Sequence, residues 1–202
     1  MADFTAKDIQ KLRVDAGVGM MDAKQALTDA AGDVDKAFEL LRERGQASMA
    51  KRADREANEG TIGTYIHIQN GRPVMGVMVE LACETDFVAK NEEFQDLLKE
   101  LTLAVCAFSP IAVSKDDIPK EAVEAEKEKY AGDLKGKPPE IAAKIVEGKL
   151  EKNLYAQKCL LHMPFPKEEK FKGSYGDFLK SKIAVLKENI VVRRFQRMEV
   201  GG

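Results

Sequence analysis

The sequence changes its periodicity at residues 83–94, Cys-Glu-Thr-Asp-Phe-Val-Ala-Lys-Asn-Glu-Glu-Phe. The preceding residues 76–82 are apolar and rich in β-branched side chains, which predicts a buried strand. Beyond the stretch, Asn91 can cap a helix whose apolar side chains recur at spacings of three and four, namely Phe94, Leu97, Leu98, Leu101 and Val105. Residues 85–88 therefore lie at a corner between a strand and a helix, where a rigid frame can hold binding groups at the surface.

Two interpretations of this corner are open from the residues alone. Asp86 beside Phe87, without a glycine to cradle phosphate or a histidine for chemistry, suits insertion into a cleft of another protein. Alternatively, Phe87 packs beneath its own helix while Thr85 or Asp86 caps that helix, because most aromatic side chains are buried. Cys83 has no histidine at a recognisable spacing, which favours a buried structural thiol over a nucleophile.

Composition limits the class of protein. The 202 residues carry 44% hydrophobic and 33% charged side chains, as expected of a soluble globular chain. A net charge of -2 argues against bulk attraction to nucleic acid or membrane, although it allows a local basic patch. The three cysteines are far apart, which indicates free thiols in a reducing compartment. With no long apolar run and no leader pattern, we expect a cytoplasmic protein without a membrane span.

The first 45 residues predict a module of three short helices. Thr5 and Asp8 form a capping-box pattern, and glycines near residues 17–19 and 32 separate the helices before Gly45 ends the third. Residues 46–60 then read as a helical linker with Lys51, Arg52 and Arg55. These cations could touch RNA, but a solvated helix face is the simpler interpretation.

Residues 61–202 predict one core domain. Ile62, Thr64, Ile66 and Ile68 alternate with their neighbours as in a half-buried strand, and Asn70-Gly71 predicts a tight turn to the next strand. Residues 114–160 look like two helices that protrude as a hairpin. Ser174 with Asp177 signals a further helix, and residues 189–200 predict a last strand at a sheet edge or a subunit contact. The expected fold is α+β, with about three antiparallel strands flanked by helices after an all-α module.

No metal cluster, phosphate loop, nucleophile elbow or dinucleotide motif is present in the sequence. Only two histidines occur, and neither has a partner at a useful spacing, which makes acid–base catalysis at neutral pH improbable. The residues alone therefore rank a protein-binding factor first, an RNA-binding protein second and an enzyme third.

Several motifs in combination resemble the bacterial elongation factor Ts family over essentially the whole chain. They are Lys11-Leu12-Arg13, Gly17-Val18-Gly19-Met20-Met21-Asp22, Cys83-Glu84-Thr85-Asp86-Phe87-Val88-Ala89, Gly136-Lys137-Pro138, and Asn189-Ile190-Val191-Val192-Arg193-Arg194-Phe195. The resemblance implies a guanine nucleotide exchange factor for elongation factor Tu, with no cofactor and no catalytic chemistry of its own. It also implies that Phe87 is inserted into a partner rather than packed under its helix.

The resemblance assigns roles to particular residues. Asp86 and Phe87, fixed by Thr85 and Val88, would push into the G domain of elongation factor Tu and dislocate the Mg²⁺ that holds GDP. Residues 1–45 would form a ubiquitin-associated-type module whose Val18, Met20 and Met21 grip a G-domain helix; methionine suits such a surface because it is flexible and polarisable.

The chain resembles the short form of the family, which pairs two subunits. We therefore expect a homodimer joined through the C-terminal strand and binding two Tu molecules. Some short members carry a cysteine where this chain has Gln196, so the dimer would be non-covalent. The family implies no membrane and no direct nucleic-acid contact. The alternative is an RNA- or ribosome-binding protein without exchange activity, using Lys51, Arg52, Arg55, Arg193, Arg194 and Arg197.

Overall fold

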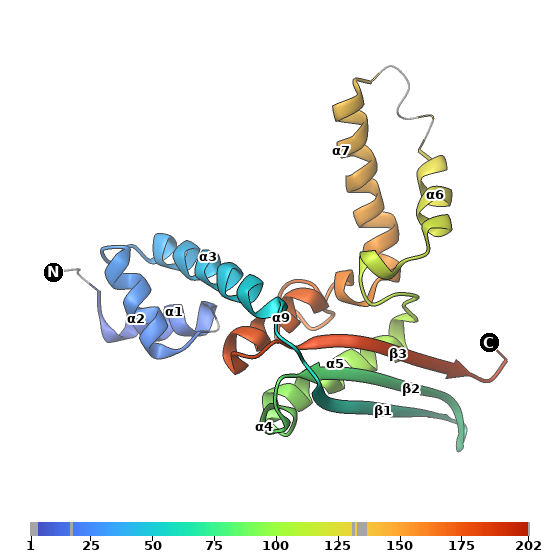
Figure 1. Ribbon diagram of the computed structural model, residues 1–202, viewed down its shortest axis with the longest axis horizontal. Coiled ribbons are helices and arrows are strands. Elements are labelled where there is room, and N and C mark those ends of the chain that lie inside the picture. The colour runs from blue at the N-terminus through green and yellow to red at the C-terminus, as the bar shows by residue number, and fades with distance from the viewer. Residues whose placement is uncertain (1–3, 17, 131, 133–136, 202) are drawn as a thin grey trace.

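The structure, a computed structural model, describes residues 4–16, 18–130, 132 and 137–201. Three N-terminal helices lead into a three-stranded antiparallel sheet with helices against it, and a pair of helices projects from this core (Figure 1). The α+β fold class predicted from the sequence is confirmed. No helix among the described residues is long and apolar enough to cross a membrane.

The N-terminal helices are α1 (Ala6–Ala16), α2 (Met20–Asp29) and α3 (Val34–Ala53). The predicted capping box at the start is confirmed, since the Thr5 backbone N–H and hydroxyl both donate to Asp8 Oδ2 at 2.7 Å. Mostly small side chains fill the seam between the helices, which lets the backbones approach closely; the buried set is Leu12, Ala23, Ala26, Leu27, Ala30, Ala37 and Leu41.

The predicted end of the third helix at Gly45 is wrong, because α3 continues to Ala53. A glycine inside a helix costs only about 1 kcal/mol relative to alanine, and good helix formers surround this one. The chain then crosses to a strand that begins at Glu59, so the predicted helical linker 46–60 is partly the second half of α3 and partly extended. The division into residues 1–45, 46–60 and 61–202 stays a prediction.

The sheet consists of β1 (Glu59–Gln69), β2 (Arg72–Cys83) and β3 (Val191–Glu199), in the order β1-β2-β3 with antiparallel pairing throughout. Asn70 and Gly71 both have positive φ, 51° and 79°, as the predicted tight turn requires. Because β2 is the central strand, β3 lies at an edge, as its arginines predicted.

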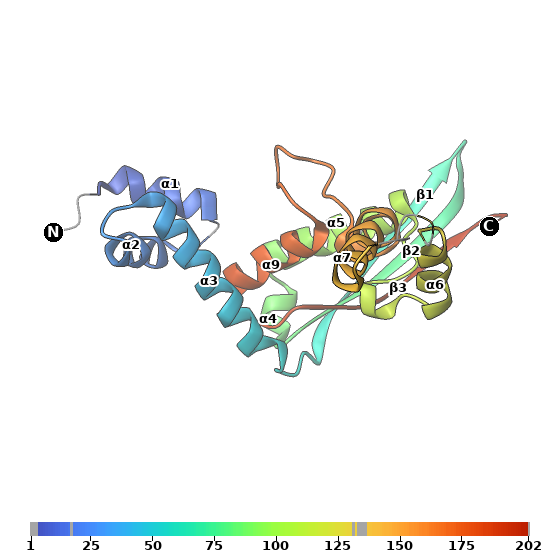
Figure 2. The ribbon, with the colours of Figure 1, turned by 90° about the horizontal axis from the view of Figure 1, so that it is seen from above.

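Helices α5 (Glu92–Phe108) and α9 (Tyr175–Leu186) pack against each other, and α5 lies across one face of the sheet (Figures 1 and 2). Asn91 caps α5 and Ser174 caps α9 through a capping box with Asp177, as predicted. The apolar face of α5 meets the inward side chains of β2 in the main core, which includes Val77, Val79, Leu81, Phe94, Leu97, Leu101 and Val105.

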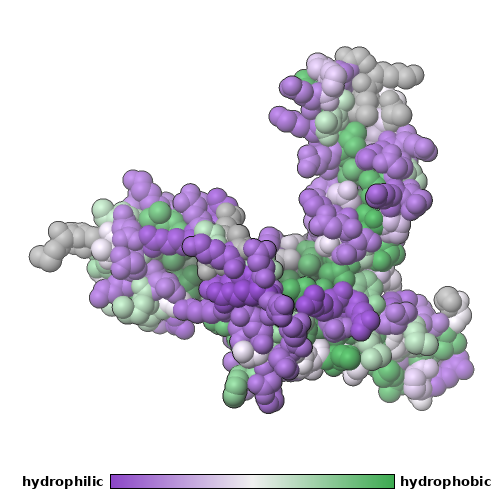
Figure 3. Space-filling model, in the orientation of Figure 1, coloured by the Kyte–Doolittle hydropathy of each residue, from purple (hydrophilic) through white to green (hydrophobic). Residues whose placement is uncertain are grey.

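The alternation of β1 is confirmed, but its isoleucine side is the exposed one. Gly63 and Tyr65 turn toward α5, whereas Ile62, Ile66 and Ile68 are each more than half exposed on the opposite face. A Cβ on Gly63 would lie 2.7 Å from Leu98 Cγ, so α5 sits directly against the β1 backbone. In Figure 3, hydrophobic residues lie among polar ones over the strands.

Helices α6 (Lys120–Glu128) and α7 (Pro139–Leu150) project together from the core, as predicted for residues 114–160 (Figure 1). Pro139 occupies the first turn of α7, where its missing N–H does no harm. Gly148 does not interrupt the helix. Short turns connect the pair to the core: η1 (Lys115–Asp117), the π-helical η3 (Glu151–Tyr155), α8 (Ala156–Lys158) and η4 (Leu160–His162). Gly136 lies outside the described residues.

Candidate functional site

The corner between β2 and α5 is a single helical turn, α4 (Asp86–Ala89), at the lower edge of the core in Figure 1. Thr85 is its N-cap, with extended backbone and a hydroxyl that accepts a hydrogen bond from the Val88 N–H at 3.4 Å. The cap fixes the direction of the turn. Val88 and Ala89 then face the core, where Ala89 is buried and Val88 packs beside it.

Phe87 faces the other way and is 81% exposed. The interpretation in which Phe87 packs beneath its own helix is therefore wrong, although the capping by Thr85 that accompanied it is confirmed. The physical reason is that one turn has few core-facing positions, and Val88 and Ala89 occupy them. A large aromatic side chain is left in water on an otherwise fixed backbone.

Asp86 forms an exposed ion pair with Lys90, with Lys90 Nζ 2.6 Å from Asp86 Oδ2. The hydrogen bond from Lys90 lowers the pKa of the Asp86 carboxyl, and the same bond raises the pKa of Lys90. Asp86 is therefore ionised at neutral pH. Because both side chains are largely in solvent, this pair is weak and either group can exchange its partner for another.

The backbone of the corner is held from behind by Glu188, which follows α9. Glu188 Oε2 accepts from the N–H groups of Glu84 and Thr85, both at 3.1 Å, and Oε1 accepts from the Thr85 hydroxyl at 2.6 Å. Sequence reasoning missed Glu188, because it lies 103 residues from Thr85 and no local pattern connects them.

Cys83 lies directly before the corner and is completely buried. Its thiol donates to the Thr85 carbonyl at 3.1 Å, and burial raises its pKa to about 11. A thiol with this pKa is protonated at neutral pH and is a poor nucleophile. The geometry agrees with the structural interpretation of Cys83.

The other predicted binding residues lie at or just before the start of α2, in the N-terminal module. Met21 is 75% exposed, Met20 is about half exposed, and Val18 is half-buried against the helices of the module. Val18 and Asp22 line a pocket together with Ala184 and Lys187, so the start of α2 faces the end of α9, beside Glu188. Gly17 lies outside the described residues.

Most of the arginines assigned to the RNA alternative have partners within the chain. Arg55 pairs with Glu84 at 3.4 Å, Arg194 with Glu80 at 2.7 Å, and Arg197 with Glu199 at 2.6 Å. Arg193 donates to the Ala57 carbonyl at 2.9 Å. Each of these four arginines therefore has an acidic side chain or a carbonyl as a partner within the chain.

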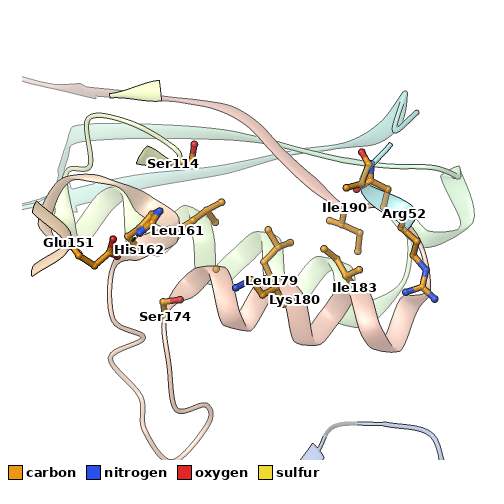
Figure 4. A pocket seen from close by; sticks show the side chains of 13 residues that line it. Arg52, Ser114, Glu151, Leu161, His162, Ser174, Leu179, Lys180, Ile183 and Ile190 are labelled. Carbon is orange, nitrogen blue, oxygen red and sulfur yellow. Dashed lines mark hydrogen bonds and ion pairs between the residues drawn. The ribbon is translucent and has the colours of Figure 1, made fainter. Parts of the chain in front are cut away.

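A cavity of about 550 Å³ lies between the end of α3, helix α9, the residues before β3 and the base of the projecting helices (Figure 4). Leu179, Ile183 and Ile190 form its apolar floor in Figure 4. Several of its polar groups have partners within the chain: His162 Nδ1 lies 2.8 Å from Glu151 Oε1, and the hydroxyls of Ser114 and Ser174 donate to the carboxylates of their capping boxes. Within the described part of the chain, no cluster of three potential metal ligands occurs.

Comparisons with known proteins agree with this architecture. A family model described as "Elongation factor TS" matches residues 5–173. The protein named Elongation factor Ts from Thermodesulfovibrio yellowstonii is 48% identical over 98% of this chain and 96% of its own length. Relatives of the same name from Moorella thermoacetica and Thermosipho melanesiensis are 46% and 45% identical over 98% of this chain, covering 96% and 99% of their own lengths.

These matches cover nearly all of both chains, so they include the N-terminal module, the corner and the sheet together. The protein is thus of the translation elongation factor class. More narrowly, the chain belongs to the elongation factor Ts family, as the motifs of its sequence predicted.

Proposed function

We propose that this protein binds elongation factor Tu and accelerates the exchange of GDP for GTP. The observation that carries the proposal is Phe87, which is 81% exposed on a turn whose backbone is fixed by Thr85 and Glu188. A preorganised aromatic side chain loses little conformational entropy on binding, and such residues are often the main anchors of an interface.

The mechanism assigns the disruptive step to Asp86 and Phe87. Phe87 enters the G domain, and the Asp86 carboxylate, ionised at neutral pH, exchanges its exposed Lys90 partner for groups of the G domain. The intruding corner dislocates the Mg²⁺ that bridges GDP to Tu. Loss of that ion removes the largest local positive charge holding the diphosphate, so GDP leaves. Thr85 and Val88 keep the corner in shape.

Exchange needs only differential affinity for the states of the partner. If the factor binds nucleotide-free Tu better than GDP-bound Tu, GDP affinity must fall by the same ratio. GTP then occupies the emptied site. The protein thus acts without a catalytic residue or cofactor of its own, and it acts in the cytoplasm.

The N-terminal tip supplies a second contact. Met20 and Met21 project from the first turn of α2 beside Val18 and are available to a G-domain helix. Because these side chains belong to α2 and not to α4, they can raise affinity for Tu without entering the nucleotide site.

A second copy of the chain would cover the outer face of the sheet. This face carries apolar side chains from all three strands, namely Ile62, Ile66, Ile68, Met78 and Met198. Gln196 and Met198 bring the edge strand β3 into the same surface, and the contact is non-covalent because Gln196 offers no thiol. An isologous pairing of two such faces would give a homodimer that binds two Tu molecules.

The test is release of a fluorescent GDP from Tu, with wild type, Phe87→Ala and the control Phe108→Ala. Phe108 lies at the far end of α5 and is also partly exposed. Loss of an interface anchor of about 2 kcal/mol predicts that Phe87→Ala slows release by roughly 30-fold. The control should match wild type.

Two outcomes count against this scheme. Equal release by wild type and Phe87→Ala would move the cause of exchange to Met20, Met21 or the core. No acceleration by wild type would reject the exchange function. RNA binding with a steep salt dependence would then favour the RNA- or ribosome-binding alternative.

A further inference from the structure

Two carboxylate side chains, Glu84 and Glu188, connect the corner with the segment between α9 and β3. Strand β2 ends at Cys83, so the N–H groups of Glu84 and Thr85 lie beyond the ladder and need another acceptor. Glu188 supplies it with both oxygens, at 2.6 to 3.1 Å. In the reverse direction, Glu84 Oε1 accepts from the Asn189 N–H at 2.7 Å. Hydrogen bonds to an ionised acceptor are about twice as strong as neutral ones.

The same junction holds the chain that leaves the N-terminal module. Asn189 is 7% exposed, and its side-chain amide donates to the Arg55 carbonyl at 2.7 Å and to the Ala53 carbonyl at 3.4 Å. Arg55 also lies 3.4 Å from Glu84. We name Glu84, Glu188 and Asn189 the junction node. It joins the corner, the end of α9 and the exit of α3.

We infer that Glu188 is the positioning residue for the exchange corner, and that the junction node ties the N-terminal module to that corner. The inference rests on the proposed exchange function and goes beyond it. The hydrogen bonds of Glu188 end on Glu84 and Thr85, so it acts on Phe87 only through the backbone and the Thr85 cap. The side-chain amide of Asn189 instead holds the chain that leaves α3, at Ala53 and Arg55.

A positioning role predicts a loss of maximal rate rather than of binding. Without the Glu188 carboxylate, two N–H groups and one hydroxyl lose their acceptor, and the turn carrying Phe87 samples other directions. The Met20-Met21 tip is unchanged, so most of the affinity for Tu is kept. Glu188→Ala should therefore lower the maximal rate of GDP release by about tenfold, the equivalent of one hydrogen bond to a charged group. The half-saturating concentration should change by less than about threefold.

Glu188→Gln and Glu100→Ala are the matched variants. A glutamine side chain in place of Glu188 keeps one oxygen as an acceptor, so Glu188→Gln should recover most of the rate. Glu100 is also a buried carboxylate and receives hydrogen bonds from Lys167 and Lys170, but it has none to the corner. Glu100→Ala therefore measures a loss of general stability, and its maximal rate should stay near that of wild type once the protein is shown to be folded.

A spectroscopic readout follows the corner itself. The chain contains no tryptophan, so Phe87→Trp places a single reporter on the turn. In this background, Glu188→Ala should lower the fluorescence anisotropy of the reporter, whereas Glu100→Ala should not. Unchanged anisotropy and an unchanged rate in folded Glu188→Ala would overturn the inference while leaving the exchange function intact. Absence of exchange in wild type, by contrast, would remove the proposed function itself.

Discussion

The two faces of the three-stranded sheet differ in a way that hydrophobicity alone does not explain. Strand β1 turns Gly63 and Tyr65 toward α5, but it turns Ile62, Ile66 and Ile68 toward solvent. The more apolar side of the strand is therefore outside. On β2 the apolar side is the buried one, as is usual, since Val77, Val79 and Leu81 face the core.

The difference shows that space is limited on the inner side of β1 at Gly63. Helix α5 lies so close that a Cβ at Gly63 would be 2.6 Å from Thr102 Oγ1, and Leu98 and Leu101 already fill the inner volume. An isoleucine in place of Gly63 would not fit there, although Tyr65 on the same side packs against the core. The isoleucines of β1 remain on the outer face, which is the surface we propose for the second subunit. The contrast can be tested one residue at a time.

The largest loss of stability is expected for a substitution on the inner face of the sheet. Leu81 is completely buried, so Leu81→Ala should lower the free energy of unfolding by about 3 kcal/mol through lost burial and an unfilled cavity. Denaturant unfolding at one fixed protein concentration measures this loss. Ile62→Ala, on the outer face of β1, is the control and should cost less than about 1 kcal/mol. Equal losses in the two variants would show that the outer face is as buried as the inner one.

Gly63→Ala should have an intermediate effect. The added methyl group meets Leu98 and Thr102 well inside normal contact distance, and overpacking of this kind costs about 1–3 kcal/mol. Gly76→Ala is the matched change on the outer face, where the new Cβ would lie 3.4 Å from Ile66 Cδ1. In denaturant unfolding, the free energy of unfolding should fall for Gly63→Ala and stay within about 0.5 kcal/mol of wild type for Gly76→Ala. A destabilised Gly76→Ala would place unexpected crowding on the outer face.

Ile66→Lys should change the stability of a single subunit least, by about 0.5 kcal/mol, because Ile66 is 55% exposed. Its effect should instead be on assembly, since a charge in the middle of an apolar contact opposes pairing. Sedimentation should show a dimer for wild type and a monomer for Ile66→Lys. Ile141→Lys, an exposed apolar position on α7, should leave the dimer intact. A dimeric Ile66→Lys would move the proposed interface elsewhere.

Local signals in the sequence predicted much of this fold. The capping boxes at Thr5 and Ser174, the Asn91 cap and the Asn70-Gly71 turn each depend on residues within three positions of one another, and all four are confirmed. The single glycine at position 45 misled, because one weak helix former does not end a helix without a competing cap.

The candidate site was less accessible from the sequence. Its position between β2 and α5 followed from periodicity, but the direction of Phe87 depends on how Val88 and Ala89 meet the core. Glu188 and Asn189 act across more than 100 residues through individual hydrogen bonds, which leave no periodic trace. The family resemblance supplied the expectation of an inserted aromatic, and the geometry explains how the chain can present one.

Because α3 is one unbroken helix, the number of its residues determines how the N-terminal module is oriented. Its 20 residues correspond to a rod of about 30 Å that ends at the junction node. Each added residue would turn everything before it by about 100°, so one insertion would point the Met20-Met21 tip away from its original direction. Seven insertions would bring it back to within about 20°, some 10 Å farther out. The length of the helix thus sets both the direction in which Met20 and Met21 point and their distance from the junction node.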